Sequence, residues 1–472
     1  MTSTQLAVLG GGPGGYAAAY LAADLGLRVT LIDNEPNPGG VCTYRGCIPS
    51  KALLHVAKLI TEAQHAPAWG IDFGKPTINL DALRAWKNAV VTKLTTGNGQ
   101  VGKMRKVQYL QGRADIVDRN TLRVALVAGG SEDVRADHIV LATGSRPTTL
   151  PGIVLQSDRL LDSTSALDLP KIPKTLLVVG GGYIGLELGT VYAALGSEIT
   201  VVEMTGGLLP GADRDLVNIV AKRFGQIAKR VLLNTKVVGM KEDPQGGVRV
   251  TFDGEVQDKE QVFESVLVAV GRRPNSNITG LEKTRVQVDR RGFIVVDEQR
   301  RTHEPSIFAI GDVAGEPMLA HKAMHEGRVA AEVIAGHRTA FEPRAIPAVV
   351  FTDPELAWCG LTETQALAAG RPIEMAKYPW GASGRAVTLD RTDGLTKLVL
   401  EPETQRILGV GIAGVGAGEL IAEGVLAVEM GATATDVKLS IHPHPTLTET
   451  VMESAEVYFG QATHVYKPKR VG

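Results

Sequence analysis

The stretch Gln5-Leu-Ala-Val-Leu-Gly-Gly-Gly-Pro-Gly-Gly-Tyr16 decides the fold, because a short apolar segment runs directly into a glycine-rich turn and then into alanine-rich sequence. The spacing G-x-G-x-x-G, in its required strand–turn–helix context, is matched by Gly10, Gly12 and Gly15. Glycines let the backbone approach a pyrophosphate, and the free N–H groups at a helix start face its charge. We predict a strand over residues 5–9, a helix over 16–25 and a dinucleotide site between them.

A second copy of this unit follows later in the chain. A predicted strand over 176–179 precedes a second glycine turn, and a helix over 186–195 and a strand over 198–202 come after it. The glycines of the second turn that fit the pattern are Gly180, Gly182 and Gly185. Asp33 follows Gly10, and Glu203 follows Gly180, by the same 23 positions. The repeat predicts two Rossmann-like dinucleotide-binding domains.

The acidic residues that end the second strand of each copy bear on cofactor choice. Asp33 and Glu203 stand where a carboxylate accepts a hydrogen bond from a ribose hydroxyl. A carboxylate there repels a 2′-phosphate, so Glu203 favours NAD over NADP. NADP remains the alternative cofactor because of Arg272 and Arg273, since arginines near a cofactor can bind its phosphate.

Two of the three cysteines lie in Gly39-Gly-Val-Cys-Thr-Tyr-Arg-Gly-Cys-Ile-Pro-Ser-Lys51. A disulfide needs Cα atoms within roughly 4.4–6.8 Å, whereas five residues of helix rise about 7.5 Å. Gly39, Gly40, Gly46 and Pro49 supply irregular backbone that allows the bridge. We interpret Cys42 and Cys47 as a redox-active disulfide, and two unpaired thiols in a loop remain the alternative.

Composition narrows the function classes. The chain has 472 residues and a formal net charge of −1, which gives no electrostatic attraction for nucleic acid or an anionic membrane. Three cysteines are too few for a secreted disulfide scaffold. The nearly uncharged stretches 6–23 and 176–196 contain the glycine turns, so we interpret them as buried strand–helix units rather than a signal peptide and a membrane span. We expect a cytoplasmic protein, and no metal site is predicted.

These residues carry a resemblance over essentially the whole chain. The cysteine stretch with two dinucleotide turns resembles the pyridine nucleotide–disulfide oxidoreductases. Within that family it is most similar to the dihydrolipoyl dehydrogenases, the E3 components of 2-oxo acid dehydrogenase complexes. Glu203 supports this choice, since glutathione-type reductases usually carry arginines there. The sequence from His442 to Glu449 also supports it, and the tail lacks the cysteine pair that ends mercuric-type reductases.

The resemblance implies a role for each matching residue. FAD would occupy the first site, where Asp33 replaces the usual Glu, and NAD the second. Cys47 would face the flavin, Cys42 would exchange with substrate, and Lys51 would approach the flavin and pair with Glu187. The other implied contacts to cofactors are Thr143, Gly144, Gly271, Asp312, Met318 and Ala320. A departure is Met324-His325, where relatives commonly have an acidic pair.

The C-terminal motif supplies the predicted base. His444 is followed by Pro445, and Glu449 lies where its carboxylate could hold the imidazole in one tautomer, as in a base-plus-orienter pair. His442 is the rival base. By resemblance, His444 acts in the partner subunit's site, which implies an obligate homodimer.

The predicted organisation is α/β, with a C-terminal α+β dimerisation domain after the two Rossmann-like domains. The predicted boundaries are residues 1–147 for FAD binding, 148–274 for NAD binding, 275–344 for a segment that completes the FAD site, and 345–472 for dimerisation. The expected partner is the lipoyl-bearing acyltransferase (E2). The alternatives are an NAD(P)H-dependent reductase of another disulfide or of a quinone, and a non-catalytic flavoprotein.

Overall fold

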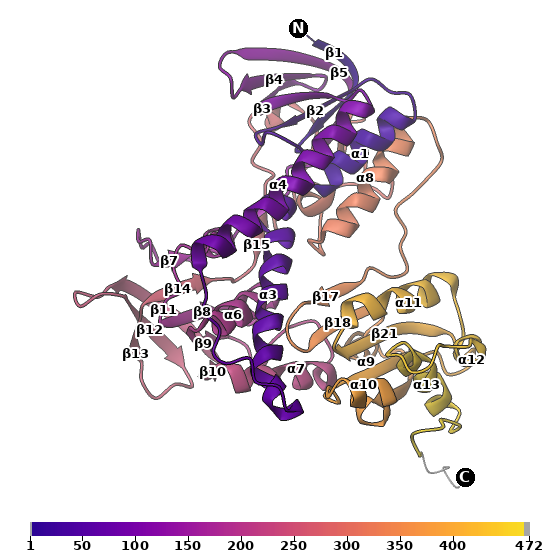
Figure 1. Cartoon of the computed structure of the whole chain (residues 1–472). Helices are drawn as coiled ribbons and strands as arrows, with labels where there is room; N and C mark the ends of the chain where they lie inside the picture. The colour runs from indigo at the N-terminus through magenta and orange to yellow at the C-terminus, as the bar shows by residue number, and fades with distance from the viewer. Residues whose placement is uncertain (1, 467–472) are drawn as a thin grey trace.

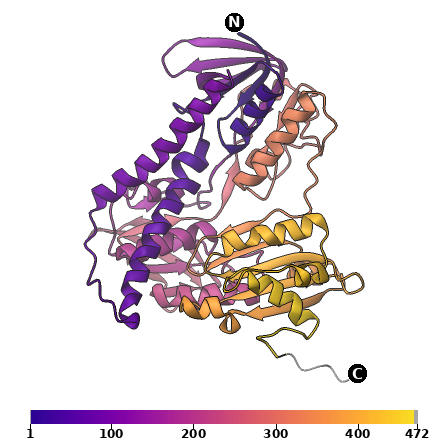
Figure 2. The ribbon, with the colours of Figure 1, turned by 45° about the vertical axis from the view of Figure 1, so that its right-hand side comes forward.

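The computed structural model describes residues 2–466. The N-terminal sheet lies at one end of the molecule, and a second sheet and the C-terminal sheet lie beside each other at the other end (Figures 1 and 2). The helices α3 (Cys47–His65) and α4 (Leu80–Met104) run from the first sheet toward the second (Figure 1). This course of α3 brings Ser50 and Lys51 to Glu187, which belongs to a helix of the second sheet.

Buried apolar strands build the first sheet. Its parallel order is β3 (Gln108–Asp118), β2 (Val29–Asp33), β1 (Thr2–Leu9), β5 (Ser131–Leu141) and β16 (Ile307–Ala309). The later part of β3 and the first part of β5 also pair antiparallel with β4 (Thr121–Leu126). Leu6, Val8 and Leu31 are completely buried, because the central parallel strands are covered on both faces. The late strand β16 shows that residues after the second sheet return to the first.

Two helices cover one face of this sheet at very close range. In both views α1 (Pro13–Asp24) lies beside α8 (Ala320–Ile334), although some three hundred residues separate them in sequence (Figures 1 and 2). A Cβ added at Gly327 would lie 2.4 Å from the carbonyl oxygen of Gly14. Glycine at these positions therefore permits the helix backbones to approach, which a larger residue would prevent.

The second sheet repeats the plan. Its parallel order is β10 (Arg230–Leu232), β9 (Glu198–Val202), β8 (Thr175–Val179), β14 (Ser265–Val268) and β7 (Leu160–Leu161). Its helices are α5 (Ser163–Leu167), α6 (Tyr183–Leu195) and α7 (Arg214–Ile227). An antiparallel meander follows, made of β11 (Thr235–Glu242), β12 (Val248–Gly254) and β13 (Glu260–Phe263). The short strands β6 (Ser145–Pro147) and β15 (Arg272–Pro274) pair where the chain crosses between the two sheets.

The C-terminal part is an antiparallel sheet with helices. The strand order is β17 (Ala348–Val350), β18 (Glu355–Gly360), β21 (Ile407–Gly414), β20 (Leu395–Leu400) and β19 (Glu374–Pro379). Its helices are α9 (Glu363–Ala368), α10 (Gly384–Thr388), α11 (Ala417–Met430), α12 (Ala434–Leu439) and α13 (Glu449–Tyr458). This agrees with the predicted α+β class.

Short 3-10 turns occur in several parts of the chain, at Ala66–Trp69, Leu281–Lys283, Gly311–Val313 and Trp380–Ala382.

The predicted strands and helices exist, and the strand over 198–202 has the predicted bounds, but both dinucleotide-site helices start earlier than predicted. Both dinucleotide-site helices begin three residues before the sequence prediction, at Pro13 and Tyr183. The last glycine of each motif belongs to the helix, because Gly12 and Gly182 already occupy the N-cap position. The domain boundaries stay predictions. Across residues 2–466, we find no helix with the length and apolar character needed to cross a membrane.

Candidate active site

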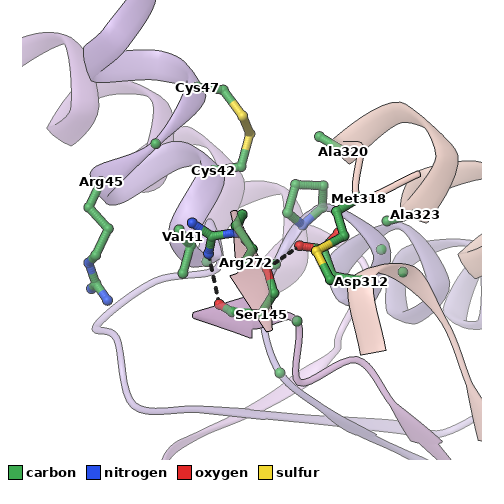
Figure 3. Close-up of a pocket in the computed structure, with 18 of the residues that line it drawn as sticks. Val41, Cys42, Arg45, Cys47, Ser145, Arg272, Asp312, Met318, Ala320 and Ala323 are labelled. Atoms are coloured by element: carbon green, nitrogen blue, oxygen red, sulfur yellow. Dashed lines mark hydrogen bonds between the residues drawn. A yellow bond between two sulfur atoms is a disulfide. The ribbon is translucent and has the colours of Figure 1, made fainter. Parts of the chain in front are cut away.

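A cavity of about 420 Å³ lies where the first sheet, α3 and α6 meet, a volume within the usual range for small-molecule sites. Predicted site residues in its lining are Gly10, Gly12, Gly15, Asp33, Cys42, Cys47, Lys51, Thr143, Gly144, Glu187, Asp312, Met318 and Ala320. Figure 3 shows that Met318 and Ala320, from the segment around α8, lie across the cavity from the disulfide. Sequence segments that are far apart thus build one site.

The first glycine turn is shaped by close backbone contacts. Gly10 has a φ of +109°, and a Cβ there would lie 2.3 Å from the carbonyl oxygen of Ala142. A Cβ at Gly15 would lie 1.8 Å from the carbonyl oxygen of Gly10. By contrast, a Cβ at Gly12 would meet only Gly40, at 4.0 Å, so space is open in front of the α1 N-terminus. This geometry fits a dinucleotide pyrophosphate.

Asp33 closes the turn at the end of β2. Its carboxylate accepts hydrogen bonds from the backbone N–H groups of Gly11 and Glu35. Burial raises the pKa of Asp33, and the bond from Gly11 opposes this shift. The carboxylate lies in the cavity lining, so it fits the predicted contact with a ribose hydroxyl.

Cys42 and Cys47 form a disulfide, and their Cα atoms are 4.7 Å apart. Cys42 lies in α2 (Gly40–Arg45) and Cys47 begins α3, while Gly46 interrupts the helix with φ −143° and ψ −111°. A Cβ at Gly46 would lie 2.9 Å from the carbonyl oxygen of Val41. Between the two cysteines, the irregular backbone that the sequence predicted is concentrated in Gly46, and Gly40 adds a φ of +57° just before Cys42.

The predicted pair of Lys51 and Glu187 joins α3 to α6. Lys51 Nζ lies 2.9 Å from Glu187 Oε2, which also accepts a hydrogen bond from the Ser50 hydroxyl at 3.1 Å. Glu187 Oε1 accepts from the backbone N–H of Phe351 at 3.0 Å, and the Lys51 ammonium lies 4.4 Å from the Phe351 ring centre. Glu187 thus ties the cysteine-bearing helix to the second and C-terminal sheets and places a cation at the cavity.

A polar chain across the cavity was not predicted. Arg272 Nε donates to the Ser145 hydroxyl at 2.7 Å, and Ser145 in turn donates to Asp312 Oδ2 at 2.5 Å (Figure 3). Arg272 also donates to the Ser145 backbone oxygen at 2.8 Å. The guanidinium is therefore engaged at the first cavity. Ser145 and Tyr183, which also lines the cavity, have no sequence signal beyond their nearness to glycine turns.

The second glycine turn repeats the geometry of the first. Gly180 has a φ of +110°, and a Cβ there would lie 2.5 Å from the Ala269 oxygen, just before Gly271. A Cβ at Gly185 would lie 2.3 Å from the Gly180 oxygen, whereas Gly182 faces open space. The glycines of this turn lie outside the lining of the first cavity, although Tyr183 and Ile184 between them are part of it, so the two predicted cofactors have separate glycine turns.

Glu203 lies beside the second turn and is nearly buried. Its Oε2 accepts from the Gly181 N–H at 2.7 Å, and its Oε1 accepts from the Thr205 N–H at 2.8 Å. The Thr205 hydroxyl donates to the same Oε1 at 2.8 Å. The carboxylate is thus held as an acceptor at the position where the sequence predicted a ribose contact.

The predicted catalytic base, His444, pairs with Glu449 in the C-terminal domain. His444 Nδ1 lies 2.9 Å from Glu449 Oε1, and Glu449 Oε2 accepts from the Thr446 N–H at 2.8 Å. Burial acts to raise the pKa of Glu449, but the Thr446 N–H and the His444 ring lower it below its usual value. The His444 side chain is 68% exposed. His444 therefore presents its other nitrogen to the surroundings while a carboxylate holds the ring.

His442, the rival base, is placed differently. Its ring nitrogens contact the Ser440 backbone oxygen at 2.8 Å and Glu423 Oε1 at 2.7 Å, and its side chain is 8% exposed. With both nitrogens engaged, His442 has the geometry of a structural residue. Among the described residues that line the cavity, none belongs to the C-terminal domain, so His444 and the disulfide stand apart within one chain.

The remaining cysteine is buried in the C-terminal core. Cys359 is 1% exposed, and burial raises the pKa of its thiol to about 12. It therefore behaves as a small apolar side chain, as the sequence predicted.

Comparison with known proteins gives the family. Residues 4–327 match Pyridine nucleotide-disulphide oxidoreductase, and residues 346–455 match the dimerisation domain of that family. Dihydrolipoyl dehydrogenase of Haemophilus influenzae is 48% identical over 99% of this chain and 97% of its own. That of Geobacillus stearothermophilus is 46% identical over 98% of this chain and 97% of its own.

Solved structures agree with this comparison. The crystal structure of LpdA from Mycobacterium tuberculosis superposes with a TM-score of 0.89 at 27% identity, covering 97% of this chain and 99% of that one. A Cu(II) complex of the HOCl-induced flavoprotein disulfide reductase RclA from Escherichia coli gives 0.85 at 27% identity, covering 97% of this chain and 100% of that one. The dimerisation domain supports the predicted homodimer, and FAD and NAD are confirmed as the cofactors. The chain belongs to the pyridine nucleotide-disulphide oxidoreductase family.

Proposed function

We propose that this chain oxidises dihydrolipoyl groups and passes their electrons through FAD to NAD. The observation that carries the proposal is the Cys42–Cys47 disulfide in the wall of the cavity that contains the first glycine turn. Relatives at 46–48% identity over nearly the full chain are dihydrolipoyl dehydrogenases, which supports the same reaction.

The reaction begins with thiol–disulfide exchange. One dihydrolipoyl thiol gives its proton to His444, because only a thiolate is a competent nucleophile. The thiolate attacks the Cys42 sulfur, a new sulfur–sulfur bond forms, and the Cys42–Cys47 bond breaks. Cys47 leaves as a thiolate. Glu449 accepts from His444 Nδ1 and stabilises the imidazolium that this step produces.

The mixed disulfide then resolves within the substrate. The second dihydrolipoyl sulfur attacks the substrate sulfur bound to Cys42 and closes the cyclic lipoyl disulfide. Cys42 leaves as a thiol, so the enzyme has gained the electron pair that the substrate has lost. The first glycine turn and Asp33 would hold FAD, which would supply the acceptor for this electron pair and pass it to NAD as a hydride. As the pair leaves, the Cys42–Cys47 bond re-forms and Cys42 gives up its proton. The Lys51 ammonium, fixed by Glu187, holds positive charge beside the reacting centre.

We infer that His444 acts in the partner subunit's site. The cavity beside the disulfide lacks a base from the C-terminal domain among the described residues of one chain, and that domain matches a dimerisation domain. A homodimer would bring the exposed His444 of each subunit to the disulfide of the other. Each active site would then need residues from both chains.

The partner and location follow from the substrate class. We propose that the dihydrolipoyl group is carried by the acyltransferase (E2) component of a 2-oxo acid dehydrogenase complex. A cytoplasmic location belongs to the same proposal, and a chain with three cysteines in total suits a reducing compartment.

A reductase of another disulfide remains the second candidate. The structural similarity to a flavoprotein disulfide reductase at 27% identity is the observation that favours it. Steady-state rates separate the two. We expect turnover with free dihydrolipoamide and NAD to exceed turnover with glutathione disulfide and NADPH by orders of magnitude. The reverse preference would overturn the proposal.

A further inference from the structure

Glu326 is a carboxylate in α8 that no step above uses. Its side chain is completely buried, with 0% exposure. A buried charge is costly unless other groups compensate it. Its contacts therefore indicate what the charge is for.

Both oxygens of Glu326 are occupied by donors from different parts of the central segment. Oε1 lies 2.9 Å from Arg300 Nη1 and 2.9 Å from Lys322 Nζ. Oε2 accepts a hydrogen bond from the backbone N–H of Gly311 at 2.6 Å. Two cations thus balance the charge on one side, and the other side holds a single backbone group.

Gly311 begins the turn that carries Asp312 into the cavity. Its φ is +73°, and a Cβ there would lie 3.0 Å from Ala323 Cβ on α8. This left-handed conformation favours glycine, because glycine has no Cβ that would clash at a positive φ. Gly311 and Asp312 both line the cavity, so the turn is part of its wall.

Lys322 holds the other end of the same turn. Its ammonium donates to the backbone oxygen of Gly315 at 3.2 Å while it pairs with Glu326. Glu326 and Lys322 lie one helical turn apart on α8, so one helix face fixes both ends of residues 311–315. Asp312 is then held where it accepts from Ser145.

We propose that Glu326 is a positioning residue for FAD, which sets the Gly311–Asp312 turn against the cofactor through the Gly311 N–H. This inference rests on the FAD site of the proposed function and extends it to a residue that contacts no cofactor. A glutamine cannot replace the carboxylate, because its amide nitrogen would face either the Gly311 N–H or the two cations. In both orientations a donor meets a donor.

FAD binding to the full-length chain stripped of its flavin tests the proposal. Glu326→Gln should weaken FAD binding on the order of tenfold, which corresponds to about 1.4 kcal/mol, because the Gly311–Asp312 turn loses its charged acceptor. The visible circular dichroism of the bound flavin should change as well, because the cofactor environment shifts. The FAD affinity of Glu326→Asp should lie between those of the wild type and Glu326→Gln, because aspartate keeps the charge but has a shorter side chain.

Glu304→Gln is the matched control. Glu304 is a carboxylate of the same segment, 6% exposed, paired with Arg285 Nη2 at 3.2 Å, and it lies outside the cavity lining. The control should lose thermal stability but keep its FAD dissociation constant within threefold of the wild type. FAD affinity of Glu326→Gln within threefold of the wild type, or an equal loss in both variants, would overturn the proposal.

Glu326→Asp decides if Glu326→Gln does not fold. The shorter side chain keeps the charge beside Arg300 and Lys322 and loses its reach to the Gly311 N–H. A loss of FAD affinity above threefold supports the proposal, and a smaller one overturns it. A wild-type chain that does not rebind FAD at all would instead count against the proposed function, so the two failures are distinguishable.

Discussion

Glu449→Gln should impair proton transfer while leaving the fold intact. The carboxylate lies 2.9 Å from His444 Nδ1, and its side chain is 17% exposed. The glutamine either offers its carbonyl to Nδ1–H without charge or turns its NH₂ toward the ring. The imidazolium formed during exchange loses a charged partner in both cases.

The size of the effect follows from this geometry. A hydrogen bond to a charged group contributes about 1.5–3 kcal/mol, and each 1.4 kcal/mol is tenfold in rate. His444 is largely exposed in the single chain, so we expect the lower part of this range, a fall in kcat of about 10- to 50-fold with dihydrolipoamide and NAD. FAD content should not change, because Glu449 lies outside the cavity lining.

The neighbouring histidine supplies a matched control. Glu423 lies 2.7 Å from His442 Nε2, so Glu423→Gln makes the same chemical change in a similar pair. We expect kcat within about twofold of the wild type for this variant, since both ring nitrogens of His442 are engaged and the proposed reaction assigns it no role. Retention of more than half the wild-type kcat by Glu449→Gln, or an equal loss in Glu423→Gln, would refute the base-and-orienter assignment.

Three further predictions follow. Glu203→Arg should weaken NAD and improve NADP, measured as kcat/KM for each, because a ribose acceptor is replaced by a phosphate partner; a native preference for NADP would contradict it. Subunit exchange between inactive Cys47→Ser and His444→Gln dimers should restore about a quarter of the activity if each site is shared, and no recovery after proven exchange would place the base in the same chain. Lys397→Met should cost about 3–5 kcal/mol in unfolding experiments, because it leaves Asp213 and Asp215 without their buried cation. Burial acts to raise the pKa values of Asp213 and Asp215, but Lys397 and the neighbouring donors lower both below the usual value. The stability that these carboxylates contribute is therefore present above about pH 4 and is lost as the pH falls through their folded pKa values. The variant should lose less stability on acidification than the wild type, and an equal loss would contradict this.

Local patterns were enough to predict both dinucleotide units. The glycine turns are defined by contacts within a few residues, such as Gly10 against Gly15, and so their spacing is visible in sequence. Helix starts were placed three residues late, because a glycine that serves the turn and a glycine that begins a helix look the same in sequence.

Long-range polar contacts could not be predicted in the same way. Ser145 meets Arg272 because β6 and β15 pair between the sheets, and it meets Asp312 because β16 pairs with β5. Glu326 reaches Gly311 through the packing of α8, and no short motif joins the two. The departure at Met324-His325 lies immediately before Glu326, and the exposed His325 takes no part in the Glu326–Gly311 contact.

Thiol labelling tests thiol–disulfide exchange most directly. The oxidised protein would be mixed without oxygen with one equivalent of dihydrolipoamide, alkylated, and mapped by mass spectrometry. We predict that Cys42 and Cys47 become labelled, that added NAD restores their disulfide before labelling, and that buried Cys359 stays unlabelled throughout. Absence of label at Cys42 and Cys47, or label that persists after NAD is added, would contradict electron transfer from the dihydrolipoyl group through this disulfide to NAD.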